Sequence, residues 1–97
     1  MNKDMLKDLT LLFVDDEAEI TNIIDSSYSG IIKNVIIAND GEAALNKFKE
    51  LYNYENNTSG IDVIVTDINM PKLNGFKLIE TIREIDTKIP MIILSAY

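Results

Sequence analysis

The chain has 97 residues, a length that suits one domain, and its 9 basic and 16 acidic side chains give a net charge of −7. It has no cysteine and no histidine, which excludes disulfides, zinc-thiolate and histidine metal sites, and a serine–histidine–aspartate triad. The acidity disfavours direct contact with nucleic acids or anionic membranes and favours cations. No apolar run approaches the roughly 20 residues of a membrane helix, and no signal-peptide core opens the chain, so we expect a soluble cytoplasmic domain.

Four short apolar runs predict strands that are buried on both faces, because they do not alternate with polar residues and are rich in β-branched side chains. The segments between them have the apolar spacing of amphipathic helices. The alternation predicts an α/β fold with a parallel sheet and right-handed crossovers. In chain order, the expected strands are 11–14, 35–38, 63–65 and 91–94, and the expected helices have apolar stripes at Ile20, Ile23, Ile24 and Tyr28, at Ala44, Leu45, Phe48, Leu51 and Tyr52, and at Leu78, Ile79, Ile82 and Ile85.

Two connections can be interpreted locally. Asn39, Asp40 and Glu42 stand where the second helix should begin, and the spacing of Asn39 and Glu42 is that of a capping box. We therefore expect these three side chains to cap that helix. The asparagine-rich segment 53–60 predicts a solvated connection without chemistry of its own.

Acidic and hydroxyl side chains follow the predicted strands. Asp15 and Asp16 end the first strand, Asp67 ends the third and Ser95 ends the fourth. In an open parallel sheet, ligands bind at the carboxyl ends of the strands. Helix capping explains a single aspartate there, but not three, and carboxylates this close are stable only around a cation. Oxygen ligands without histidine or cysteine select Mg²⁺, which commonly binds phosphate oxygens as well.

The segment Asp67-Ile68-Asn69-Met70-Pro71, followed by Gly75, resembles the phosphoacceptor loop of response-regulator receiver domains. Three further segments resemble the family in the same order, and together they span about residues 9–97. The resemblance implies a flavodoxin-like, doubly wound parallel sheet with strand order 2-1-3-4. The three segments are 11–17, 39–45 and 90–97.

The same resemblance implies a role for individual residues. Asp67 would accept a phosphoryl group from a sensor histidine kinase or a phosphotransfer protein. Ser95 would donate its hydroxyl to a phosphoryl oxygen, and the side chains of Asn69 and Tyr97 would modulate the lifetime of the phosphoryl group. The implied Mg²⁺ ligands are Asp16 directly, Asp15 mainly through water, Asp67, and the backbone carbonyl of Asn69.

The chain departs from the family pattern after Tyr97, where the family continues with a helix, a fifth strand and a last helix. The fifth strand carries the lysine that pairs with the phosphoryl group. Lys88 lies at the wrong end of the fourth strand, and Lys72 should point to solvent. We therefore interpret residues 1–97 as a receiver domain that is incomplete at its C-terminus, and we expect weak phosphoryl transfer. We also expect exposed apolar side chains on the first, third and fourth strands, and self-association through them.

Other functions remain open at this point. A phosphorylation-independent pseudo-receiver would dock a partner protein with the same fold. A phosphatase of the haloacid-dehalogenase type is disfavoured, because its second aspartate would fall at Asn69 and its nucleophile would follow the first strand. As a receiver, the domain would catalyse its own phosphorylation on Asp67 and would not be a turnover enzyme. An output domain, if one exists, lies beyond residue 97.

Overall fold

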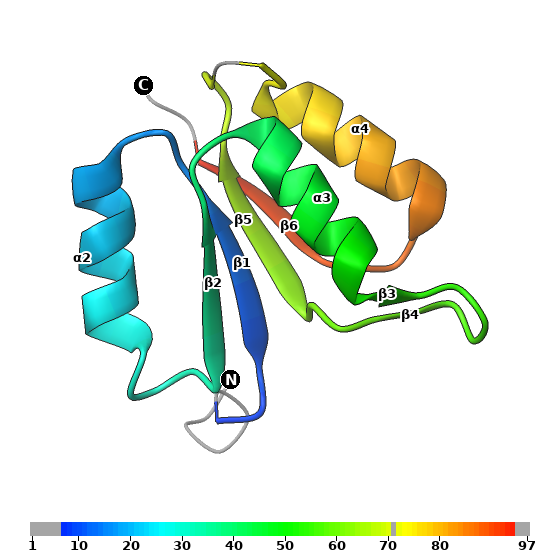
Figure 1. Cartoon of the computed structure of the whole chain (residues 1–97), viewed down its shortest axis with the longest axis horizontal. Coiled ribbons are helices and arrows are strands. Elements are labelled where there is room, and N and C mark those ends of the chain that lie inside the picture. The colour runs from blue at the N-terminus through cyan, green and yellow to red at the C-terminus, as the bar shows by residue number, and fades with distance from the viewer. Residues whose placement is uncertain (1–6, 71, 95–97) are drawn as a thin grey trace.

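A computed structural model describes residues 7–70 and 72–94, and it has strands and helices in alternation (Figure 1). All the predicted strands and helices are present. Two additional short strands lie between the second and third predicted strands. The elements are β1 (Thr10–Val14), α2 (Ala18–Tyr28), β2 (Asn34–Ala38), α3 (Gly41–Leu51), β3 (Tyr52–Asn53), β4 (Thr58–Ser59), β5 (Val63–Asp67), α4 (Gly75–Ile85) and β6 (Met91–Leu94).

The main sheet is parallel and has the order β2-β1-β5-β6. Because β5 and β6 are the third and fourth strands that the sequence predicts, the expected order 2-1-3-4 is confirmed. Val14 lies beside Ala38 on one neighbour and Thr66 on the other, and Asp67 lies beside Leu94. The carboxyl ends of the strands therefore meet at one edge of the sheet, at the arrowheads in Figure 1.

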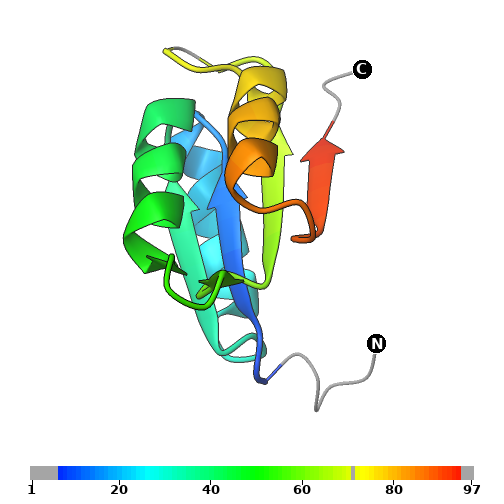
Figure 2. The same ribbon diagram turned by 90° about the vertical axis from the view of Figure 1, so that its right-hand side faces the viewer.

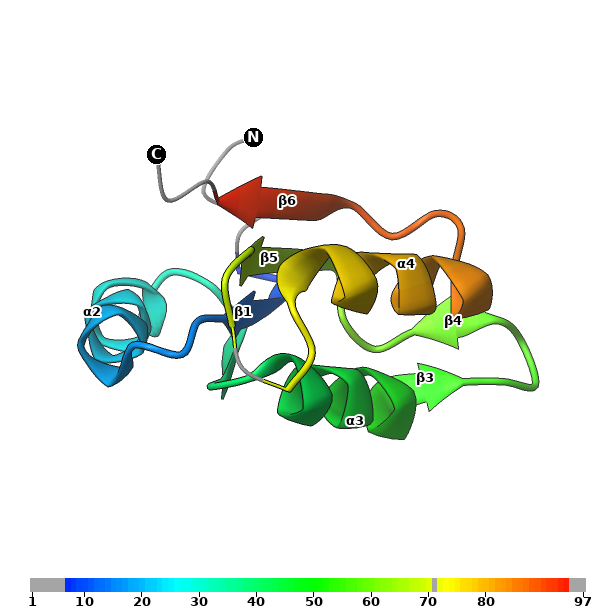
Figure 3. The same cartoon turned by 90° about the horizontal axis from the view of Figure 1, so that it is seen from above.

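The sheet separates two layers of helix, with α2 on one side and α3 and α4 on the other (Figure 3). Figure 2 shows α3 and α4 side by side. Successive residues of β1 alternate between the two sides, as a strand requires: Leu12 packs into the larger core with α3 and α4, and Phe13 packs on the α2 side. The fully buried side chains of the larger core include Leu12, Phe48, Ile64, Leu78 and Ile82.

The apolar stripe predicted for the first helix is wrong for most of its members. Ile20, Ile23 and Tyr28 are exposed, whereas Ile24 packs against the smaller core. Helix α2 is the single helix that the described residues place on its side of the sheet, and its contacts are mainly with β2. Since residues 7–70 and 72–94 place no second helix on that side, the flank of α2 that carries Ile20, Ile23 and Tyr28 is exposed to solvent.

The apolar face expected on the sheet is present on β6 and absent on β1. Ile92 and Leu94 are 51% and 42% exposed, and Val65 is half-buried beside Ile92. Leu11 and Phe13 of β1 are buried, because α2 and the segment after it cover that part of the sheet. The expectation is therefore confirmed for the fourth strand, met only in part by the third, whose Val65 is half-buried, and wrong for the first.

Helix α3 begins one residue later than the capping-box interpretation requires. Asp40 is its N-cap and accepts a hydrogen bond from the Ala43 amide at 2.7 Å through Oδ1. Asn39 does not cap the helix; its amide nitrogen lies 3.4 Å from the backbone oxygen of Asp15. The cap from Asp40 is confirmed, and the capping box from Asn39 and Glu42 is wrong.

The segment 53–60 is not a simple connection, because β3 and β4 pair in it as an antiparallel hairpin. Tyr52 leaves α3 and is buried as the first residue of β3, with its ring centroid 4.8 Å from that of Tyr54. Asn57 adopts the left-handed backbone conformation, with a φ of 56°, which asparagine tolerates better than most residues. The aromatic pair and the turn residue account for a hairpin that apolar periodicity could not predict.

Candidate functional site

Three carboxylates meet at the edge of the sheet where the strands end. Asp15 and Asp16 follow β1, Asp67 is the last residue of β5, and one oxygen from each lies within 4.8 Å of the others. The reason is the register, since β1 and β5 are parallel neighbours and Val14 lies beside Thr66. Asp15, which follows Val14, and Asp67, which follows Thr66, therefore lie at the same level of this edge.

Asp15 is the buried member of this acidic site, at 7% exposure. Its Oδ1 accepts a hydrogen bond from the Glu17 amide at 2.9 Å. Burial raises the pKa of the Asp15 carboxyl, the Glu17 amide opposes this effect, and the nearby charges of Asp67 and Asp16 raise the pKa further. The negative charge on Asp15 is therefore unfavourable in the folded protein unless a cation offsets it.

The carboxylate of Asp67 is oriented by its own loop. Its Oδ1 accepts a hydrogen bond from the Ile68 amide at 2.8 Å. The preceding residue, Thr66, is fully buried and donates its hydroxyl to the backbone oxygen of Asp67 at 2.9 Å. Both bonds restrict how Asp67 can turn at the end of β5.

The loop after Asp67 leads into α4 through Gly75. The Gly75 amide donates to the backbone oxygen of Ile68 at 2.9 Å, and a Cβ atom on Gly75 would overlap the backbone oxygen of Asp67. Within the same loop, Met70 is buried in the larger core. Close approach of two backbones therefore explains this glycine, since its φ is not positive.

The remaining predicted site residues are placed only in part. The side chain of Asn69 is exposed, in the loop that follows Asp67. Ser95 and Tyr97 lie outside the described residues. Leu94 pairs with Asp67, so β6 leads to the same edge of the sheet as the acidic site.

A family model described as the response regulator receiver domain matches residues 11–97. The chain belongs to this family. A relative from Guillardia theta, named as a probable transcriptional regulator ycf27, is 41% identical over 86 residues, which are 89% of this chain and 30% of that protein. The transcriptional regulatory protein TrcR of Mycobacterium tuberculosis is 32% identical over 91% of this chain and 31% of its own length. The receiver chain thus spans about a third of these curated relatives.

Solved receiver structures are similar to it. The chemotaxis protein CheY4 of Vibrio cholerae superposes with a TM-score of 0.77 at 26% identity, covering 93% of this chain and 70% of its own. The response regulator TrrA of Thermotoga maritima, described as a complex with Mg²⁺-BeF, has a TM-score of 0.77 at 28% identity. It covers 92% of this chain and 70% of its own. The family assignment and the flavodoxin-like fold inferred from the sequence are therefore confirmed.

Two residues contact the backbone of the acidic site in ways that the sequence did not predict. Thr66 has no predicted role beyond the end of a strand, although its hydroxyl holds the backbone of Asp67. Asn39 is predicted to cap a helix, but its side chain contacts the backbone oxygen of Asp15 and, at 3.5 Å, the hydroxyl of Thr21. The strand-end rule could have found Asn39, because it follows β2, the other neighbour of β1.

Lys72 is exposed to solvent, as expected, and it also forms an ion pair that the sequence did not predict. Its side chain is 60% exposed, and its Nζ lies 3.5 Å from Oδ2 of Asp40, at the start of α3. Within the described ranges, no ion pair involves the three carboxylates of the acidic site. Lys72 is thus paired with a helix N-cap and does not balance the charge of the acidic site.

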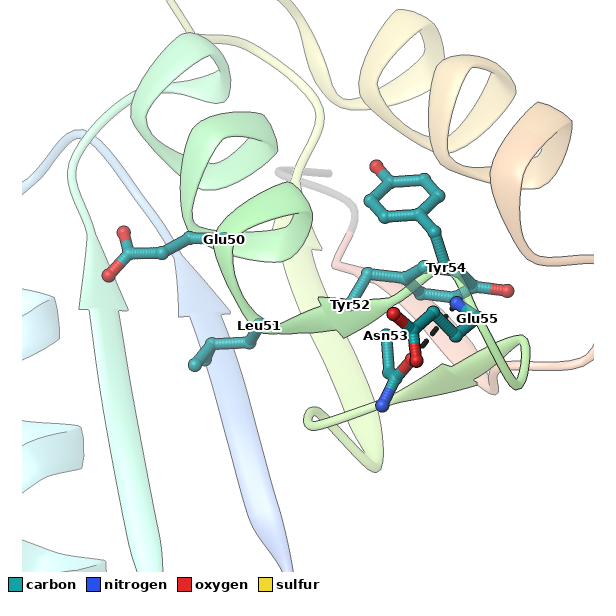
Figure 4. A pocket seen from close by; sticks show the side chains of 6 residues that line it. All are labelled: Glu50, Leu51, Tyr52, Asn53, Tyr54 and Glu55. Carbon is teal, nitrogen blue, oxygen red and sulfur yellow. Dashed lines mark hydrogen bonds between the residues drawn. The ribbon is translucent and has the colours of Figure 1, made fainter.

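A hollow on the surface of the receiver domain lies by β3, at the opposite end of the sheet from the acidic site (Figures 1 and 4). Figure 4 shows Glu50 and Leu51 pointing away from the Tyr52–Tyr54 pair, so the polar groups do not converge. Oδ1 of Asn53 accepts a hydrogen bond from the backbone amide of Glu55, within the same hairpin. The hollow therefore contributes nothing to the chemistry at Asp67.

Among the described helices, none is long and apolar enough to cross a membrane.

Proposed function

We propose that this receiver domain accepts a phosphoryl group on Asp67, with Mg²⁺ bound by the acidic site. The observation that supports this most directly is the convergence of three carboxylates within 4.8 Å, one of them buried. Like charges at this separation destabilise one another, and burial strengthens the effect. The donor set consists of hard oxygen ligands, which fits Mg²⁺ and does not fit a soft metal.

The residues of the chain suit the transfer of a phosphoryl group to a carboxylate. A carboxylate oxygen of Asp67 forms the new bond to phosphorus while the bond from phosphorus to the donor nitrogen breaks. The electron pair of that bond stays on the leaving nitrogen, which takes up a proton. Positioning provides much of the catalysis in such a step, and the amide of Ile68 orients the Asp67 carboxylate in advance. Bound Mg²⁺ supplies charge neutralisation on the transferring group.

The roles of the remaining site residues form part of the proposal. Asp16 is exposed and follows β1, which suits direct coordination of the metal. Asp15 is buried and its Oδ1 is already engaged by the Glu17 amide, which suits contact through water. Asn69 contributes its backbone carbonyl, Ser95 donates its hydroxyl to the phosphoryl group, and the side chains of Asn69 and Tyr97 modulate its lifetime.

The partners follow from the family. A sensor histidine kinase or a phosphotransfer protein supplies the phosphoryl group, and the domain works in the cytoplasm without turning over an external substrate. We assign residues 1–97 to one receiver domain, because the family model matches residues 11–97. Relatives named as transcriptional regulators are about three times as long, which supports an output domain beyond residue 97. The exposed apolar residues of β6 support self-association through the sheet.

The deciding experiment is intact mass spectrometry after incubation with phosphoramidate and Mg²⁺. One added phosphoryl group is expected, and it should be absent in Asp67→Asn and in a chelated sample. Asp25→Asn, which removes an exposed acid from α2, is the matched control and should behave as the parent.

Two other results would count against the proposal. Equal labelling of the parent and Asp67→Asn would move the acceptor to another residue. No labelling and no Mg²⁺ binding by the folded parent would favour the pseudo-receiver, which docks a partner without phosphorylation.

A further inference from the structure

The loop that follows Asp67 is joined to the start of α3 by an ion pair between two distant segments. Nζ of Lys72 lies 3.5 Å from Oδ2 of Asp40. The other oxygen of the same carboxylate, Oδ1, accepts the Ala43 amide at 2.7 Å and caps α3. Asp40 therefore holds the helix through one oxygen and the loop through the other.

The backbone of the loop fits closely against α3 at the same place. A Cβ atom on Gly41 would overlap the backbone oxygen of Leu73 and would lie 2.7 Å from its carbonyl carbon. Lys72 has a φ of 68°, a left-handed conformation that is unfavourable for a residue with a side chain. Such a conformation persists where surrounding contacts hold it, and the ion pair with Asp40 is one of these contacts.

The base of the loop is the part that contacts Asp67. Ile68 donates its amide to the Asp67 carboxylate and accepts the Gly75 amide, so it links Asp67 to the start of α4. Met70 anchors the first half of the loop in the core, whereas Lys72 lies in the second half, three residues before Gly75. A shift at Lys72 therefore reaches Ile68 through Gly75, whose amide donates to the backbone oxygen of Ile68.

We propose that Asp40 and Lys72 are positioning residues for the acidic site: their ion pair holds the tip of the loop on α3 and thereby keeps Ile68 in place beside Asp67. The inference rests on the proposed function, because it assigns these two residues to the site that would bind Mg²⁺. Neither residue is one of the three clustered carboxylates.

The size of the effect follows from the exposure of the pair. The Lys72 side chain is 60% exposed and that of Asp40 is 21% exposed. Exposed ion pairs contribute little to stability. Losing this one should therefore raise the equilibrium constant for local opening of the loop by about two- to fivefold, and it should not abolish the site. The effect should shrink in high salt, where the Debye length falls to about 3 Å at 1 M.

Simple long-range electrostatics makes a different prediction, which allows a sharp test. Asp40→Asn removes a negative charge near the acidic site and Lys72→Met removes a positive charge. Charge alone would therefore change Mg²⁺ affinity in opposite directions in the two variants. If the ion pair positions the loop, both variants should bind Mg²⁺ more weakly than the parent. The side-chain amide oxygen that Asp40→Asn introduces can still accept the Ala43 amide, so the helix cap is retained.

The experiment measures amide hydrogen exchange in the metal-free protein and Mg²⁺ titration by NMR, for the parent and both variants. We expect exchange at Ile68 and Gly75 to rise about two- to fivefold in each variant, and Mg²⁺ affinity to fall by a similar factor. The double variant should be no worse than either single one, because both remove the same contact.

Two controls separate positioning from general stability. Lys72→Arg keeps the charge and should preserve the parent values. Lys47→Met removes an ion pair of the same length, 3.5 Å to Glu50, near the other end of α3. It should leave the Ile68 and Gly75 amides unchanged.

Three results would overturn the inference: exchange rates that match the Lys47→Met control, opposite shifts in Mg²⁺ affinity, or additive losses in the double variant. If the parent itself binds no Mg²⁺, the proposed function fails. Exchange in the metal-free protein would then still decide whether the ion pair positions Ile68.

Discussion

Gly75 lies against the backbone of Asp67 with no room for a side chain between them. A Cβ atom there would overlap the backbone oxygen of Asp67 and would lie 3.1 Å from its carbonyl carbon. The Gly75 amide also donates to the backbone oxygen of Ile68. The first residue of α4 therefore fixes the path of the chain as it leaves the acidic site.

Gly75→Ala should destabilise the fold at this contact. We expect a loss of about 1–3 kcal/mol in the free energy of unfolding, because the added methyl group forces two backbone segments apart. Urea unfolding measures the change. Gly30→Ala is the control, since no heavy atom lies within 4 Å of the Cβ position at Gly30. Similar losses in the two variants would contradict the close approach at Gly75.

Asp15→Asn should stabilise the metal-free protein at neutral pH. Burial, with the charges of Asp67 and Asp16, raises the pKa of Asp15 above its usual 3.8, so the folded protein keeps the proton to a higher pH than the unfolded chain. The contribution of this group to stability therefore falls as pH rises from 3.8 through its folded pKa. Asparagine stays neutral and keeps an oxygen for the Glu17 amide.

The test is urea unfolding of the parent and Asp15→Asn in a chelator, from about pH 3 to pH 7, the range over which a raised carboxyl pKa changes stability. The advantage of the variant should be largest at the neutral end and should vanish below pH 3.8. Asp25→Asn again serves as the exposed control. An advantage of equal size at every pH would show that the effect is not electrostatic.

Mg²⁺ should stabilise the folded protein through the acidic site. Above the dissociation constant, each tenfold increase in free Mg²⁺ should add about 1.4 kcal/mol to the free energy of unfolding, because the ion binds only the folded state. Thermal unfolding at matched ionic strength measures this. Asp16→Asn should remove most of the increase, and Asp25→Asn should retain it. A response that survives Asp16→Asn would place the ion elsewhere.

Asp40→Ala should cost about 1 kcal/mol of stability, because α3 loses its N-cap. Asp40→Asn should cost less, since its amide oxygen can replace Oδ1. The Ala43 amide, with a smaller contribution from Lys72, lowers the pKa of the Asp40 carboxyl below 3.8. Its stabilising contribution is therefore present above pH 3.8 and is lost as pH falls through the folded pKa. Equal losses in the two variants would show that the charge matters more than the cap.

Self-association should depend on the uncovered face of β6. Ile92→Lys places a charge at a side chain that is 51% exposed, so the fold should tolerate it while any association weakens. Sedimentation velocity across a range of concentrations measures the change. Phe76→Lys, at an exposed aromatic on α4, is the control. A parent that sediments as a monomer at all concentrations would exclude association through this face.

The elements that the sequence predicted correctly are those with a strong local signal. The continuous apolar runs of β1, β2, β5 and β6 indicate buried parallel strands on their own. Aspartates placed directly after two such strands must meet at one edge once those strands are neighbours, so the convergence of Asp15 and Asp67 was predictable from spacing. The cap from Asp40 is equally local, because it acts on an amide three residues away.

Features that depend on contacts between distant segments could not be predicted from local sequence patterns. The exposure of Ile23 depends on what lies beside α2, and the hairpin at Tyr52 depends on the aromatic contact with Tyr54 and on the asparagine-rich turn. Asn39 and Lys72 are polar residues whose partners are distant in the sequence and become neighbours only in the folded chain. Hydropathy and spacing therefore determined the strands and the aspartates at their ends, and the resemblance to receiver domains supplied the strand order. Tertiary packing decided how the surrounding loops hold the acidic edge in place.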